Sequence, residues 1–253
     1  VAGRVLHFSG DLGREDDALM RPPAPLSDTD LLVCESTYGN RDHPPVDVAV
    51  ELANVVCRVA ARGGVILIPA FAVGRTQEVL VHLERLRRQG RIPELPVFVN
   101  SPMAQAASAI HAQFGSEHRL SAQECERICE FATPVRTVEE SRALNLCKGP
   151  MIIISASGML TGGRVLHHVM AFGQDPRNAI VLAGFQAGGT RGARLVRGER
   201  SLRIFGRDIP ISAEVVALQG LSAHADRSGL MRWLRRAPRP PDLVYVTHGE
   251  PDA

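Results

Sequence analysis

Four titratable residues follow strand-like apolar runs in this chain, and their side chains suit hydrolysis or ligand binding. Asp11 comes shortly after the run VLHF, and Glu35 ends the run LLVCE. His224 follows VVAL within a few residues, and His248 directly follows LVYVT. A single histidine at a strand end is usually a surface or structural residue. Four such positions indicate a hydrolase or a binding site, because ligands of α/β folds bind where strands end in loops. Each position is also close to a Gly or Ser, whose small side chain lets the backbone come close to a ligand.

Apolar strands and amphipathic helices alternate along the chain and must position these four residues. The apolar runs predict strands, listed by residue number as 30–35, 65–71, 96–100, 151–157 and 178–185. Helical periodicity predicts helices within 46–64, 74–90 and 101–114, with Ser101 as the N-cap of the last. The alternation indicates an α/β fold with largely buried sheets.

The composition is that of an ordinary globular protein. The chain has 253 residues, 45% of them hydrophobic and 22% charged, enough for one large domain or two smaller ones. A net charge of +2 does not by itself demand a nucleic-acid partner. An aromatic content of 4% argues against an extended base-stacking platform. No apolar run reaches the ~18 residues of a membrane span, so no membrane partner is expected.

Five cysteines without a disulfide framework indicate a reducing compartment, and a cytoplasmic location is expected. Cys125 and Cys129 have a spacing that a metal pair could use. Together with Ile128 and Ala132 they also form one helical face. We therefore favour buried small hydrophobic residues over a metal site.

Seven motifs occur in a fixed order along the sequence: FSGDLGRED, CESTYGNRDH, LIPAFAVGRTQEVL, SPMA, SASGMLTGGRVLHH, LSAHAD and VTHGE. Together they resemble the β-CASP family of the metallo-β-lactamase superfamily. The likeness is to its RNA-processing nucleases, similar to the mRNA 3′-end-processing endonuclease and its prokaryotic relatives. It spans almost the whole chain.

The resemblance implies an α/β chain in two lobes. Residues 1–39 and 222–253 would be C-terminal pieces of a metallo-β-lactamase fold, present here in part. Residues 40–221 would be an inserted α/β β-CASP domain. This arrangement would explain why the aspartate at the start of the sequence and the histidines at its end belong to one site.

The resemblance also implies roles for the four residues. In the family, two zinc ions share a bridging carboxylate and activate water for attack on a phosphodiester. Asp11 matches the bridging carboxylate, and His248 matches the last histidine ligand. His224 matches the general acid to the leaving oxygen, and Glu35 matches the acid that orients it.

Other polar residues are candidates for contact with RNA phosphates. Ser222 lies beside His224, while Ser157 and Arg164 lie in the glycine-rich run SASGMLTGGR. For these last two, a tight turn followed by a helix start is an equal alternative. His167 and His168 fall in a helix-like run, where a structural role is favoured over metal binding.

Five arginines recur every third residue, at positions 191, 194, 197, 200 and 203. They could follow an RNA backbone. A solvated face is the favoured reading, because Gly192 and Gly198 interrupt any long helix there.

One motif of the superfamily, His-x-His-x-Asp-His, is not found in this sequence, nor is the further histidine ligand that precedes the bridging aspartate. Each zinc needs about four ligands, which Asp11 and His248 cannot supply for two ions. We therefore expect two Zn²⁺ in the complete protein and an incomplete site in this chain. The chain alone is expected to be inactive, as the C-terminal part of a nuclease or a truncated relative.

The predicted function is that of a zinc-dependent ribonuclease that hydrolyses RNA phosphodiester bonds in RNA processing or decay. One alternative is a catalytically inactive β-CASP scaffold or RNA-binding subunit. Another is a DNA-repair nuclease of the same family, although such relatives usually carry Val in place of His248. RNA is the expected partner and a homodimer is an option. The RNA target, the oligomeric state, and the choice between endonuclease and exonuclease stay open.

Overall fold

The computed structural model describes residues 3–218 and 220–253, and the chain divides into two compact units. Unit 1 comprises Val1–Pro45 and Ser222–Ala253, and unit 2 comprises Val46–Leu221. The sequence had placed the boundaries after residues 39 and 221. The α/β class expected from the sequence is confirmed: both units contain parallel sheets with helices.

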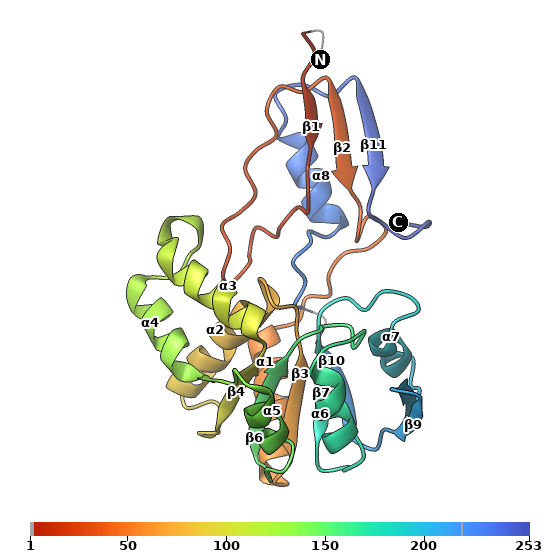
Figure 1. Ribbon diagram of the computed structural model, residues 1–253. Coiled ribbons are helices and arrows are strands. Elements are labelled where there is room, and N and C mark those ends of the chain that lie inside the picture. Colours follow the sequence, from red (N-terminus) through yellow and green to blue (C-terminus); the bar gives the residue numbers. More distant parts are fainter. Residues whose placement is uncertain (1–2, 219) are drawn as a thin grey trace. The chain divides into compact units, whose positions relative to one another are not determined.

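Unit 1 is built on a three-stranded parallel sheet with the order β1-β2-β11. Its strands are β1 (Leu6–Phe8), β2 (Leu31–Glu35) and β11 (Leu243–Thr247). One face carries the helix α8 (Arg227–Arg235), as Figure 1 shows. The side chain of Asp226 caps this helix by accepting a hydrogen bond from the backbone N–H of Gly229 at 2.7 Å.

The core of unit 1 lies between the sheet and α8. It consists of Leu12, Leu26, Leu32, Cys34, Ala225, Leu230 and Trp233. The indole N–H of Trp233 donates to the carbonyl of Ala24 at 2.8 Å, so the polar atom of this buried ring is satisfied. On the opposite face of the sheet, the side chains in register with Leu31 and Val33 are exposed: Leu6, Phe8, Leu243 and Tyr245.

Unit 2 contains a six-stranded parallel sheet with the order β10-β7-β3-β6-β4-β5. The strands are β3 (Val65–Pro69), β4 (Val97–Asn100), β5 (Thr133–Pro134), β6 (Met151–Ser155), β7 (Ala179–Ala183) and β10 (Glu214–Leu218). Every residue of β3, β6 and β7 is buried. This confirms the prediction that these apolar runs are strands covered on both faces.

The three helices predicted from periodicity are present in unit 2 as α1 (Val48–Ala61), α2 (Arg75–Arg88) and α3 (Pro102–Gln113). The other helices described there are α4 (Ala122–Phe131), α5 (Val138–Leu144), α6 (Val165–Phe172) and α7 (Arg191–Val196), with a 3-10 turn at Gly115–Glu117. Of these, α5 and α7 were not predicted. Ser101 caps α3, as predicted. An antiparallel hairpin, which the sequence analysis did not anticipate, is formed by β8 (Ser201–Ile204) and β9 (Arg207–Pro210).

One detail of the predicted core is wrong. Cys125 and Ile128 of α4 are buried, but Cys129 is exposed. The helix ends at Phe131, so Ala132 does not extend the predicted face. The buried stripe is therefore made by Cys125, Ile128 and Phe131.

Among the described residues, no helix combines the length and the apolar character that crossing a bilayer requires.

Candidate metal centre

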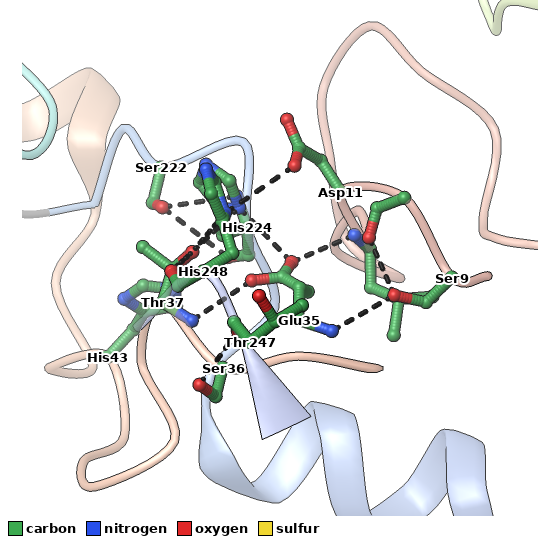
Figure 2. A network of polar contacts seen from close by, with 12 residues as sticks. Ser9, Asp11, Glu35, Ser36, Thr37, His43, Ser222, His224, Thr247 and His248 are labelled. Atoms are coloured by element: carbon green, nitrogen blue, oxygen red, sulfur yellow. Dashed lines mark hydrogen bonds and ion pairs between the residues drawn. The ribbon is translucent and has the colours of Figure 1, made fainter. Parts of the chain in front are cut away.

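Three side chains that can bind metal converge in unit 1. Asp11, His224 and His248 each offer one donor atom, and these atoms lie within 4.8 Å of one another (Figure 2). Asp11 follows β1, His248 follows β11, and His224 lies in the loop before α8. Because the strands are parallel, their carboxyl ends meet at one edge of the sheet and bring these distant positions together.

Glu35, at the end of β2, holds His224 in place. The carboxylate is only 3% exposed, and its Oε1 accepts hydrogen bonds from Nδ1 of His224 at 3.1 Å and from the backbone N–H of Leu12 at 2.8 Å. Its Oε2 accepts from the backbone N–H of Thr37 at 3.0 Å. These partners fix the carboxylate, and the carboxylate in turn orients the imidazole ring of His224 through Nδ1.

Glu35 is ionised despite its burial. Burial by itself raises the pKa of this carboxyl, but the hydrogen bonds from His224 and Thr37 outweigh it and hold the pKa below its usual value. A carboxylate at this distance stabilises positive charge on the imidazole of His224.

His248 is more open to solvent than His224. Its side chain is 57% exposed and that of Asp11 is 67% exposed, with 3.6 Å between Nδ1 of His248 and Oδ1 of Asp11. The backbone of His248 has a φ of 60°, a left-handed conformation that turns the chain sharply after β11. Gly249 follows because a Cβ there would lie 2.4 Å from Oγ of Ser36.

Thr37 is a site residue to which the sequence analysis gave no role. It is buried, and its Oγ1 lies 3.1 Å from Nδ1 of His248 and 3.3 Å from Nδ1 of His224. The same hydroxyl also donates toward the carbonyl of His248, 3.2 Å away. Thr37 therefore links the two histidines. Its place two residues after Glu35, in the motif CESTYG, was the available signal.

His43 supports the same loop and was also missed. Its Nε2 lies 2.9 Å from the carbonyl oxygen of His224, and its backbone N–H donates to Asp226 at 3.1 Å. Asp226 thus caps α8 and holds the 37–43 loop at the same time. Both contacts fix the backbone of the His224 loop.

The three predicted RNA-contact residues are occupied by internal hydrogen bonds. Ser222 is buried, and its Oγ accepts from the backbone N–H of His224 at 3.2 Å. Ser157 lies in unit 2, where its Oγ accepts from the N–H of Thr161 at 3.0 Å. Arg164, also in unit 2, donates to Oδ1 of Asn100 at 2.9 Å. Their contact with RNA stays a prediction.

Of the two histidines for which a structural role was favoured, His168 has one, whereas His167 is exposed on α6. His168 is buried between Asn100 and Asn145, with Nε2 and Nδ1 each 2.6 Å from an amide, and burial lowers its pKa to about 4. In the arginine series, Arg194 pairs with Glu199, and Arg203 pairs with Asp208. Arg197 also lies 3.5 Å from Glu199, so three of these five arginines form ion pairs inside unit 2.

One carboxylate and two imidazoles are a donor set that suits zinc. Three such donors fit one ion with an open position. Within the described residues no further His, Cys, Asp or Glu joins the group, so the set does not complete two zinc shells. The ionised Glu35 behind His224 also suits a metal centre, because carboxylates commonly orient histidines there.

Sequence comparison adds family membership to this geometry. Residues 76–195 match the Beta-Casp domain, and residues 208–253 match the Zn-dependent metallo-hydrolase RNA specificity domain. The chain belongs to the β-CASP family of the metallo-β-lactamase superfamily. The resemblance drawn from the seven motifs is thereby confirmed, and the family is one of zinc-dependent metallo-hydrolases.

Named relatives of this β-CASP chain include a bacterial and two archaeal proteins. It is 39% identical to Ribonuclease TTHA0252 of Thermus thermophilus over 98% of this chain and 58% of that protein. It is 34% identical to Transcription termination factor FttA of Methanosarcina mazei over 97% of this chain and 41% of that protein. It is 31% identical to an RNase J-like protein of Methanocaldococcus jannaschii over 99% of this chain and 59% of that protein. The chain thus spans about half the length of these relatives.

Proposed function

We propose that this chain carries part of the catalytic centre of a zinc-dependent ribonuclease that hydrolyses RNA phosphodiester bonds. The observation that carries the proposal is the convergence of Asp11, His224 and His248, with Glu35 bonded to His224. Two relatives named as ribonuclease or RNase J-like, together with the RNA specificity domain, support RNA as the substrate.

Asp11 and His248 are the proposed metal ligands. They are the most exposed members of the cluster, so an ion bound to them would be reachable by substrate and water. Bound zinc would supply Lewis-acid chemistry, lowering the pKa of water and neutralising charge on phosphate oxygens. Thr37 positions His248 through its hydroxyl.

His224 is the proposed general acid. Its Nδ1 is bonded to Glu35, and Nε2 is the nitrogen proposed to act on the substrate. During hydrolysis a water molecule gives a proton to the solvent as its oxygen bonds to phosphorus, and a P–O bond of the RNA breaks. The proton on Nε2 passes to the leaving oxygen, and the imidazole then regains a proton from the solvent. Glu35 favours the protonated imidazole and so keeps that proton available.

A cleavage assay on the polypeptide encoded by the complete reading frame tests this function. A labelled single-stranded RNA and a DNA of the same sequence are incubated with zinc, with and without a chelator. We expect chelator-sensitive RNA cleavage. Glu35→Gln should slow it, and His224→Ala should slow it more, by about 10²–10⁴-fold.

The alternatives give different results in the same assay. RNA binding without cleavage by a zinc-loaded protein would identify an inactive scaffold or RNA-binding subunit. Cleavage of DNA in preference to RNA would identify a DNA nuclease. Either outcome contradicts the ribonuclease proposal.

The metal count is part of the proposal. The complete site is proposed to hold two zinc ions, while the 253-residue chain should retain little zinc after dialysis, because its described residues offer three donors. Elemental analysis measures this directly, and two zinc ions held tightly per chain would refute it. The homodimer and the cytoplasmic location remain predictions.

A further inference from the structure

The β8–β9 hairpin of unit 2 carries an aromatic residue at its tip. Ile204 pairs with Arg207, so the turn consists of Phe205 and Gly206 alone. Both have left-handed backbone, with φ of 48° and 79°. Two-residue turns of this kind favour Asn-Gly or Asp-Gly, and a bulky residue at positive φ is strained. Strain of this kind is often retained at functional positions.

The ring of Phe205 forms half of an exposed aromatic stack. It stacks on the ring of His167 in α6, with ring centroids 4.9 Å apart and an interplanar angle of 30°. Phe205 is 59% exposed although one face of its ring is covered by His167. The other face is therefore open to solvent and can accept another planar group.

The stack has a rigid support. Leu202, Ile204 and Ile209 of the hairpin are buried in the core of unit 2 beneath it. Arg191 donates to the carbonyl of Arg203 at 2.8 Å and to that of Leu160 at 3.1 Å, which ties β8 to the loop that precedes α6. A fixed platform loses little entropy when a ligand stacks on it.

Positive charge lies next to this platform. Arg207 directly follows the turn and is exposed, and in the described part of the chain its side chain forms no hydrogen bond or ion pair. Arg203 precedes the turn and is paired with Asp208. The platform thus combines an open aromatic face with one uncommitted cation, the pairing by which proteins hold a base and its phosphate.

We propose that the open face of Phe205, backed by His167, stacks on a base of single-stranded RNA while Arg207 contacts an adjacent phosphate. This rests on the proposed function only in taking RNA as the ligand. The contact reads no base edge, so it would tolerate any sequence. It is an RNA-binding position outside the catalytic cluster.

Phe205→Asn is the sharpest test, because asparagine suits the left-handed turn better than phenylalanine. The variant should fold at least as well as the parent while lacking the ring. With the 253-residue chain and a fluorescent ten-nucleotide RNA, we expect its affinity to fall about tenfold. The loss should vanish on an abasic oligonucleotide with the same phosphates, since that probe has no base to stack.

Matched controls isolate the site. Phe114→Ala removes a phenylalanine that is 56% exposed at the end of α3 and should leave affinity unchanged. Arg207→Gln should weaken binding and reduce the slope of log K against log salt by roughly 0.7. Arg142→Gln, at another exposed arginine of unit 2, should weaken binding less.

The outcomes separate this inference from the function. Equal RNA affinity of Phe205→Asn and parent would overturn the stacking site, even if the protein cleaves RNA. A loss of equal size on abasic RNA would also overturn it, as would a parent that binds no RNA. Altered oligomeric state with unchanged RNA affinity would assign Phe205 to a protein contact instead. A base-dependent loss of affinity supports the site even in a protein that fails to cleave.

Discussion

The two units use parallel sheets in different ways. In unit 2 the central strands β3, β6 and β7 are buried at every residue. In unit 1, β11 is exposed along its whole length, with its four apolar residues between 41% and 65% exposed. The sheet of unit 2 is therefore covered on both faces, whereas the described sheet of unit 1 has its hydrophobic core on one face only.

The titratable cluster lies in unit 1, at the edge of the sheet where its parallel strands end. Its buried polar residues, such as Glu35 and Thr37, hold two histidines that come from distant parts of the sequence. The buried polar residues around His168 in unit 2 instead satisfy one another. Buried polar residues thus position an exposed cluster in unit 1, whereas in unit 2 they form hydrogen bonds with one another.

The chromophores allow each unit to be followed separately. The single tryptophan and both tyrosines, at positions 233, 38 and 245, belong to unit 1. Among the described residues, every α-helix except α8 belongs to unit 2. Tryptophan fluorescence therefore reports the unfolding of unit 1, and far-UV circular dichroism reports mainly that of unit 2.

The largest expected effect is a truncation in the core of unit 2. Ile153 lies in β6 with no exposed surface, so Ile153→Ala should lower the free energy of unfolding by about 2–5 kcal/mol. Urea denaturation should show the loss in circular dichroism, with the fluorescence transition unmoved. An equal shift of the circular-dichroism and fluorescence transitions would show that the two units unfold together. The contrast drawn between the units would then be wrong.

Acid should weaken unit 2 through His168. Its pKa is about 4 in the folded protein against an ordinary value of 6.5, so the contribution of its neutral form is complete above pH 6.5 and is lost as pH falls toward 4. Between pH 7.5 and pH 5 we expect a loss of about 2 kcal/mol in the circular-dichroism transition. His168→Gln should remove most of this pH dependence. A variant with the same pH dependence as the parent would contradict the assignment.

A smaller effect is expected at Thr37. Thr37→Val removes the hydroxyl that joins the two histidines but keeps the backbone N–H that binds Glu35. Unit 1 should lose about 1 kcal/mol, measured from the tryptophan fluorescence transition. An unchanged fluorescence transition would show that the hydroxyl contributes nothing to the order of the site.

The smallest effect should come from the exposed strand of unit 1. Val246→Ala, in β11, should change the free energy of unfolding by no more than about 0.5 kcal/mol, because the side chain is already 65% exposed. Fluorescence-detected urea denaturation measures it beside the unit 2 variant. A loss as large as that of Ile153→Ala would mean that this strand is covered in solution.

Much of this fold could be predicted from the sequence because apolar periodicity is local. The strand predicted at 151–157, which is observed as Met151–Ser155, and the helix capped by Ser101 could be predicted from neighbouring residues alone. Apolar periodicity could not predict contacts between segments that are distant in the sequence. Thr37 gained its role from His248, more than two hundred residues away, and the strained turn at Phe205 lacks the usual Asn-Gly pair. The roles proposed for Asp11 and His224 came from motif resemblance and not from periodicity.

The division of labour between the two histidines is the central claim for the site. It is tested most directly by zinc content after dialysis of the polypeptide from the complete reading frame. Asp11, His224 and His248 are all close enough to bind one ion, and metal-bound histidines often carry a carboxylate partner, so His224 also fits a ligand role. We predict that His248→Ala loses zinc and that His224→Ala keeps the parent amount. Loss of zinc from His224→Ala, or full retention by His248→Ala, would contradict the assignment.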